Sequence, residues 1–307
     1  MANRTWYLST SALTGVFAAS FGTAVSAADI KSLSPAPGAP PAASLPAVSG
    51  INGKISGFGG WEEHDLGPDG GLFGVEGSLS VPLGHSFGVQ VDGMAASLDG
   101  DFIGGVAGHL FWRDPSVGLL GLYGDWITRD FSGVDTWRLG VEGEYYSGPI
   151  SVEAIVGYED ADVPAIVLID DKNLFAYADL AYYATPDLRF SVGYRRLNDL
   201  DMAAAGAEWQ LPTDFIGGTS LFAEGRIGDD DYASVWAGLR VYLAAENKTL
   251  IRRHREDDPG SKLSSNIFDF DRCSIPTDVG VDFDGQVEVA APVRALPREC
   301  FFDEGDF

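Results

Sequence analysis

The sequence predicts an all-β fold, a closed antiparallel transmembrane β-barrel of about twelve strands. Between Ile51 and Leu243, segments of roughly ten residues alternate apolar with polar or small side chains, and turn residues separate them. Nothing in the sequence indicates a set of helices that would cover the apolar faces, so lipid is the expected cover. The connections between segments also alternate between acidic and nearly neutral, which a soluble sandwich does not explain.

The N-terminal residues are expected to direct export. Residues 1–27 combine Arg4, a mostly apolar stretch and the small-residue site Val25-Ser26-Ala27, which together are typical of a signal peptide. No other stretch has the eighteen or more apolar residues that a spanning helix needs. Residues 28–50 are rich in proline and alanine, which bury little area, and predict a flexible periplasmic linker. We therefore expect a protein of the outer membrane of a Gram-negative bacterium.

Residues 51–243 are predicted to form the barrel. Its clearest strands are Trp137–Tyr145, Ile150–Tyr158 and Leu188–Arg195, where apolar residues fall on one parity and charges on the other. Twelve strands agree with the even numbers found in bacterial single-chain barrels. The other nine predicted strands are Ile51–Trp61, Leu72–Leu83, Phe87–Leu98, Phe102–Trp112, Leu119–Thr128, Leu174–Tyr183, Met202–Leu211, Thr219–Ile227 and Tyr232–Leu243.

The connections predict an orientation in the membrane. Odd-numbered connections are acidic, as in Asp229-Asp230-Asp231, whereas even-numbered ones are short and nearly neutral, as in Gly84–Ser86 and Ser147–Pro149. If the first strand starts from the periplasm, the acidic connections lie outside the cell. An even strand count then leaves both termini periplasmic.

Residues 244–307 lose the alternation and predict an irregular, charged periplasmic tail. Cys273 and Cys300 both lie there, and an even cysteine count in an exported chain suggests one disulfide. Two free thiols or a metal site are the alternatives, although no second Cys or His stands at zinc spacing. The tail is also a candidate for binding a periplasmic partner through Arg252, Arg253 and Arg255.

Charged residues on the inward parity are the candidate lumen and selectivity residues, because a charge facing hydrocarbon costs several kcal/mol. Pairing across strands is expected for Arg138 with Glu153 or Glu142, and for Arg189 or Arg195 with Asp179 or Glu208. Twelve strands leave open whether the lumen is a closed core or a passage. The candidates are Asp92, His109, Asp125, Arg138, Glu142, Glu144, Glu153, Asp179, Arg189, Arg195, Glu208, Glu224, Arg226 and Arg240, together with Lys54 and Glu76.

Five tryptophans fall on the outward parity near predicted strand ends, where they are typical of the aromatic girdles at membrane interfaces. Trp236 is inward by parity and does not fit this pattern. The girdle candidates are Trp61, Trp112, Trp126, Trp137 and Trp209.

The last predicted strand, with Trp236-Ala-Gly-Leu-Arg-Val-Tyr-Leu243, partly matches the signal that the outer-membrane assembly machinery reads. Over roughly residues 50–243 the chain resembles the small OmpA-like and porin-like outer-membrane barrels of alphaproteobacteria. This resemblance implies architecture and location rather than a function. It also implies contact with the assembly machinery, with membrane lipid and with lipopolysaccharide, the last through divalent cations at the acidic loops.

The formal charge of −25, from 45 acidic and 20 basic residues, excludes nucleic acid as an expected partner. No cofactor is indicated, and the acidic clusters lack the spacing of an EF-hand loop, so no metal site is predicted. His109 has a place on the inward parity, where Asp92 or Asp125 could orient it for catalysis. His64, in the first acidic loop, is a second acid–base candidate.

Three functions follow. The first is a narrow passive channel that prefers small cationic solutes, because acids outnumber bases in the predicted lumen. The second is a structural or anchoring barrel with a sealed lumen and a partner-binding tail. The third is an outer-membrane enzyme built around His109 or His64.

Overall fold

The computed structural model describes residues 44–63, 70–98, 100–130, 134–162, 172–198, 200–212, 218–229, 232–243, 247–266, 279–281 and 287–289. The expected signal peptide, most of the linker, His64, Cys273 and Cys300 lie outside these residues. The disulfide between Cys273 and Cys300 therefore remains a prediction.

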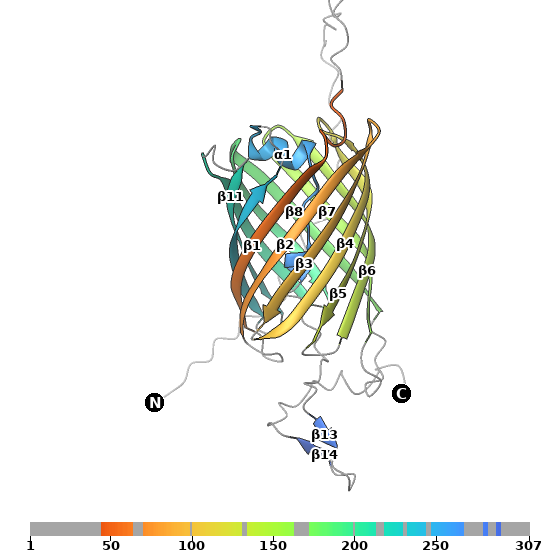
Figure 1. The fold of residues 1–307 in the computed structure, drawn as a ribbon, viewed down its shortest axis with the longest axis vertical. Coiled ribbons are helices and arrows are strands. Elements are labelled where there is room, and N and C mark those ends of the chain that lie inside the picture. The colour runs from red at the N-terminus through yellow and green to blue at the C-terminus, as the bar shows by residue number, and fades with distance from the viewer. Residues whose placement is uncertain are drawn as a thin grey trace, which may run out of the picture. The chain divides into compact units, whose positions relative to one another are not determined.

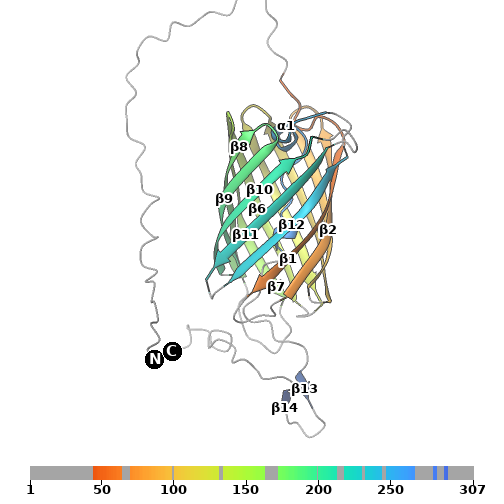
Figure 2. The ribbon, with the colours of Figure 1, turned by 90° about the vertical axis from the view of Figure 1, so that its left-hand side faces the viewer.

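Twelve antiparallel strands close into a barrel, as the sequence predicts (Figures 1 and 2). Each strand pairs with its sequence neighbours, and β1 closes the ring against β12, with Lys54 opposite Tyr242 and Trp61 opposite Val235. The strands are β1 (Asn52–Glu63), β2 (Gly70–Leu83), β3 (Phe87–Leu98), β4 (Asp101–Asp114), β5 (Gly118–Arg129), β6 (Val134–Ser147), β7 (Ile150–Asp162), β8 (Lys172–Thr185), β9 (Leu188–Leu197), β10 (Leu200–Gln210), β11 (Thr219–Gly228) and β12 (Ala233–Tyr242).

Side chains alternate between the two faces of the barrel wall because successive residues of a strand point to opposite sides. In β5, Leu120 and Leu122 are 64% and 55% exposed, whereas Tyr123 and Asp125, on the opposite parity, are buried. The same alternation in the other strands covers the outer surface with Val, Leu, Ile and Phe side chains. An apolar surface of this extent requires lipid rather than water, since monomeric soluble proteins expose only small apolar patches.

The five girdle candidates all lie on the outer surface, and each is at least 40% exposed. Trp61, Trp126 and Trp137 lie near one end of the barrel, whereas Trp112 and Trp209 lie near the other. Trp236 is buried inside, as its parity predicts. Outward-facing tryptophans near both ends are the arrangement expected of a wall that crosses a membrane.

The two ends of the barrel differ. We call the end with the connections 84–86, 115–117, 148–149, 186–187 and 211–218 the turn mouth, and the opposite end, where the acidic connections lie, the loop mouth. Gly84 and Gly148 have φ values of 76° and 53°, which glycine adopts without the strain of a Cβ, and they permit the tight turns. The N-terminal residues enter at the turn mouth, where the Ala47 amide donates to the His85 carbonyl.

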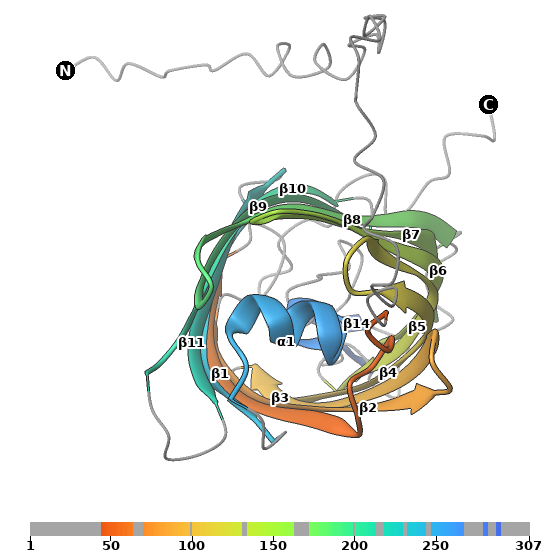
Figure 3. The ribbon, with the colours of Figure 1, turned by 90° about the horizontal axis from the view of Figure 1, so that it is seen from above.

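The C-terminal part differs from the expectation of a tail lying wholly in the periplasm. After β12 the chain forms α1 (Leu250–Glu256) across the turn mouth and α2 (Leu263–Asn266) inside the barrel (Figures 1 and 3). We call residues 248–266 the inserted segment. Two short strands, β13 (Val279–Val281) and β14 (Val287–Val289), pair with each other beyond it. Among the described residues, no helix has the length and apolar character to cross a membrane.

Candidate functional site in the barrel lumen

Helix α1 is held at the turn mouth by polar and apolar contacts. Leu250 is fully buried and packs with Tyr183 and Tyr242 of the wall. The Tyr183 hydroxyl lies 2.8 Å from His254 Nδ1, and the Tyr242 hydroxyl lies 3.0 Å from His254 Nε2. The Ile251 amide donates to the Pro186 carbonyl at 3.0 Å. These contacts fix the helix against β8, β12 and the turn that joins β8 to β9.

The basic residues of α1 contact the barrel itself. Arg253 is 1% exposed and donates from Nε to Gln210 Oε1 at 3.0 Å. Arg255 donates to the Ile150 carbonyl at 2.8 Å and lies over the ring of Tyr146. Arg252 pairs with Glu256 one turn later. The sequence suggests that this basic cluster binds a periplasmic partner. The contacts offer a competing explanation, in which the arginines dock the helix in its own barrel.

Beyond α1 the inserted segment enters the lumen. Asp258 forms an ion pair with Lys54 of β1, and both side chains are 5% exposed. The Lys54 ammonium also donates to the Pro259 carbonyl at 3.1 Å, and the Gln90 side-chain amide donates to the same oxygen at 3.2 Å. Burial of a charge requires such compensation, because an unpaired charge away from water is costly.

Helix α2 lies deeper in the barrel. The Ser264 amide donates to Glu76 at 2.9 Å, and the Ser265 carbonyl accepts from Arg226 at 2.9 Å. The Asn266 carbonyl accepts from Arg129 at 3.1 Å, while its side-chain amide donates to Asp125 at 2.7 Å. Leu263 is fully buried in the apolar cluster of the interior. Glu76 of β2, Arg226 of β11 and Arg129 of β5 therefore hold α2 by its main chain.

The lumen candidates from the sequence point inward, and most of them are paired. Arg195 lies 2.8 Å from Asp179, which confirms one of the expected pairs. Arg189 bonds Glu153 at 3.0 Å instead of Asp179 or Glu208. Further pairs join Arg240 to Glu208 and Arg226 to Glu224, at 2.7 and 2.9 Å. Many charged side chains of the wall are therefore paired with one another on the lumen surface.

The expected pairing of Arg138 with Glu153 or Glu142 is wrong. Strand register places Arg138 directly opposite Asp125 on β5 and Glu159 on β7, whereas Glu153 lies opposite Glu144. Arg138 accordingly bonds Glu159 at 2.8 Å and lies 3.5 Å from Asp125. The sequence identifies the inward residues but not the register that decides their partners.

His109 lies between two carboxylates. Its Nε2 is 3.1 Å from Asp92 and its Nδ1 is 2.8 Å from Glu142, and its side chain is fully buried. Neither carboxylate in its ionised form can donate, so the arrangement requires both ring nitrogens to donate. A general base needs a nitrogen with a free lone pair, and His109 held in this way has none. Asp92 orients it as expected, but Asp125 instead contacts Tyr123, Arg138 and Asn266.

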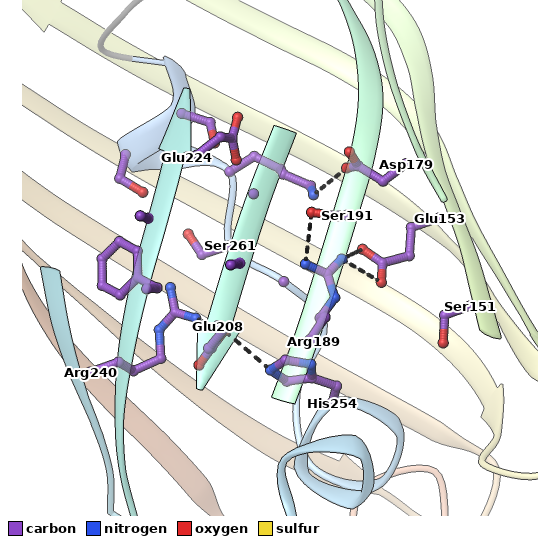
Figure 4. A pocket seen from close by; sticks show the side chains of 18 of the residues that line it. Ser151, Glu153, Asp179, Arg189, Ser191, Glu208, Glu224, Arg240, His254 and Ser261 are labelled. Carbon is purple, nitrogen blue, oxygen red and sulfur yellow. Dashed lines mark hydrogen bonds and ion pairs between the residues drawn. The ribbon is translucent and has the colours of Figure 1, made fainter. Parts of the chain in front are cut away.

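A cavity of about 110 Å³ remains between the wall and the inserted segment (Figure 4). Strands β6 to β11 contribute Glu144, Glu153, Asp179, Arg189, Arg195, Glu208 and Glu224 to its lining. The inserted segment contributes His254, Arg255 and Lys262, and Figure 4 shows His254 directed toward Glu208. The cavity is therefore a charged space between wall and segment, with room for a few water molecules.

Sequence reasoning missed the inserted segment. Its partners in the wall, such as Lys54, Glu76 and Arg129, are single residues far from one another in the chain, and no motif connects them. The one signal in the sequence was that acids outnumber bases among the inward residues, so the wall could not pair all of its acids by itself. In the described ranges no group of three His, Cys, Asp or Glu is placed to hold a metal ion.

Comparisons with known proteins give similarities in architecture only. No family model matches the chain, and no curated protein matches it. A solved structure of the KdgM porin with oligogalacturonate is 11% identical, with a TM-score of 0.43, covering 61% of this chain and 98% of that one. The translocator domain of the autotransporter NalP from Neisseria meningitidis is 14% identical, with a TM-score of 0.41 and coverages of 63% and 87%. Outer membrane phospholipase A from Escherichia coli is 15% identical, with a TM-score of 0.41 and coverages of 66% and 93%.

Proposed function

We propose that this protein is an outer-membrane barrel that passes small solutes through a passage narrowed by its own C-terminal segment. The observation that carries the proposal is the charged cavity between the wall and the inserted segment. Charged side chains are costly to hold beside an empty or apolar space, so the cavity between them favours water as its content. The transport that we propose is passive diffusion.

The inserted segment sets the size and the charge of this passage. Five acids and six Lys or Arg side chains line the cavity, and two of those bases, Arg255 and Lys262, come from the segment. The sequence predicts a preference for cations. We propose this preference for the wall alone, because acidic side chains outnumber basic ones in the part of the lining that the wall contributes. The segment brings the lining close to balance and weakens that preference.

Single-channel recording in planar bilayers tests the proposal. The full chain is compared with a chain that ends at Leu243, both first shown to be folded by their heat-modifiable migration in gels. We expect small conductance steps for the full chain, and larger, more cation-selective steps for the shortened chain. If the shortened chain inserts as a folded barrel and gives no conductance, the channel proposal is wrong.

A sealed structural barrel is the second candidate, and the depth of the inserted segment favours it. In that case the full chain would insert without conductance, whereas removal of the segment would open the lumen. For orientation, we propose that the turn mouth faces the periplasm, since the N-terminal residues enter there. Acidic loops at the outer face would then share divalent cations with lipopolysaccharide.

A further inference from the structure

Residues 44–50, which we call the strap, meet the inserted segment in the turn mouth. The Ser49 amide donates to the Glu256 carbonyl at 2.9 Å, and the Ser49 hydroxyl donates to Asp257 Oδ1 at 2.6 Å. The Lys248 ammonium donates to the Ser49 hydroxyl at 2.7 Å and to the same oxygen of Asp257 at 2.6 Å. Since Lys248 precedes α1 and Asp257 follows it, Ser49 bridges the residues on the two sides of the helix.

The strap has contacts of its own with the wall. Val48 is 1% exposed and packs with Phe111 of β4 and Leu119 of β5. The Ala47 amide donates at 2.7 Å to the carbonyl of His85, in the turn between β2 and β3. The strap is therefore fixed to the part of the rim that β2 to β5 form.

Helix α1 is fixed to another part of the rim. Tyr183 of β8 and Tyr242 of β12 contact His254 of the helix, and Pro186 accepts from Ile251. Figure 3 shows the strap and α1 together inside the ring of strands. The strap thus links α1 to β4 and β5, which are separated in the ring from β8 and β12.

The contacts between the strap and the segment involve buried charges. Asp257 and Lys248 are 1% and 4% exposed and form an ion pair. The Ser49 hydroxyl supports both members of this pair, because it donates to the carboxylate and accepts from the ammonium. Buried charges depend on such partners. Withdrawal of the strap would remove the hydroxyl from the ion pair and the amide donor from the Glu256 carbonyl.

We propose that the strap retains α1 in the turn mouth, so that its release from β4 and β5 frees the helix and opens the entrance to the lumen. The strap and α1 then form a two-part closure, built from the residues directly before and after the twelve strands. Such a closure acts by local detachment, which costs less free energy than unfolding of the barrel. Retention of the helix is independent of conductance, whereas opening of the entrance rests on the proposed channel.

Hydrogen exchange of the α1 amides tests the retention. Val48→Asn places an amide in the apolar site of the strap and should speed this exchange about tenfold, because burial of an unpaired polar group is costly. Ser49→Ala removes the hydroxyl, keeps the backbone amide and should speed it about two- to tenfold. Leu45→Asn is the matched control, since Leu45 lies in the same strap and is 51% exposed.

All four proteins are first shown to be folded by their heat-modifiable migration in gels. Faster exchange in α1 for Val48→Asn and Ser49→Ala, with unchanged exchange for Leu45→Asn, supports retention by the strap. Equal exchange in all four proteins, or an equal increase in Leu45→Asn, would overturn it.

Single-channel recording of the same proteins separates this inference from the proposed channel. We expect Val48→Asn to open more often than the unmodified chain and than Leu45→Asn. Faster exchange in α1 without conductance in any variant would refute the channel and leave retention of the helix supported. Faster exchange in a variant whose openings match those of the unmodified chain would refute control of the entrance by the strap.

Discussion

Lys54 of β1 and Asp258 of the inserted segment form an ion pair inside the barrel, 204 residues apart in the sequence. Each side chain is 5% exposed, so neither can be left alone without a buried, uncompensated charge. The pair therefore links the position of the C-terminal segment to the first strand of the wall.

Replacement of Lys54 by methionine should loosen the inserted segment. Loss of one partner of a buried pair costs about 3–5 kcal/mol, because the other charge remains. We expect faster hydrogen exchange in residues 248–266 and larger or noisier conductance. The double variant Lys54→Met/Asp258→Leu removes both charges and should recover slow hydrogen exchange. Equal exchange in the unmodified chain, the single variant and the double variant would show that the ion pair does not hold the segment.

Replacement of His109 by alanine should destabilise the barrel, because Asp92 and Glu142 then face each other without the imidazolium between them. We expect a loss of about 3–5 kcal/mol, as for other broken buried charge pairs. Urea-dependent unfolding from lipid vesicles measures it. His85→Ala is the matched control, since His85 lies in an exposed turn, where its ring contacts the Ser44 hydroxyl. Similar losses in both variants would contradict the structural role of His109.

An arginine introduced on the outer surface should destabilise the barrel, and the loss should be larger the deeper the residue lies in the membrane. Leu122 lies in the middle of β5, and Leu122→Arg should cost about 2–4 kcal/mol of folding free energy in vesicles. Ile227 lies at the end of β11, and Ile227→Arg should cost about 0–1 kcal/mol. Equal costs at the two positions would argue against a lipid-facing wall.

The pair of Arg189 and Glu153 in the cavity should set ion selectivity. Arg189→Gln leaves the Glu153 carboxylate unpaired beside the passage, so the reversal potential under a salt gradient should shift toward cation preference. Glu153→Gln should shift it the other way. The two variants remove matched partners of one 3.0 Å pair, and shifts of the same sign would rule out the proposed passage.

Period-two alternation was sufficient to predict the barrel. The predicted strand Phe87–Leu98 is the observed β3, because alternation depends only on which side of the wall each residue faces. The partners of Arg138 were not predictable, since they depend on register, which aligns Arg138 with Asp125 and Glu159. The inserted segment was not predictable either. Its seven-residue helix is too short to show an apolar stripe, and the segment contacts side chains spread over β1 to β12.

The most direct test of the inserted segment is a chemical cross-link between Glu76→Cys and Ser264→Cys in a chain with Cys273→Ser and Cys300→Ser. The Ser264 amide lies 2.9 Å from the Glu76 carboxylate, so one glutamate side chain separates the two positions, and we predict that a short bifunctional maleimide joins the two cysteines within one chain in membranes. The cross-strand pair Ile55→Cys/Gly77→Cys is the positive control, because these residues are opposite each other on β1 and β2. Formation of the control cross-link without any cross-link between 76 and 264 would contradict the presence of the C-terminal segment in the lumen.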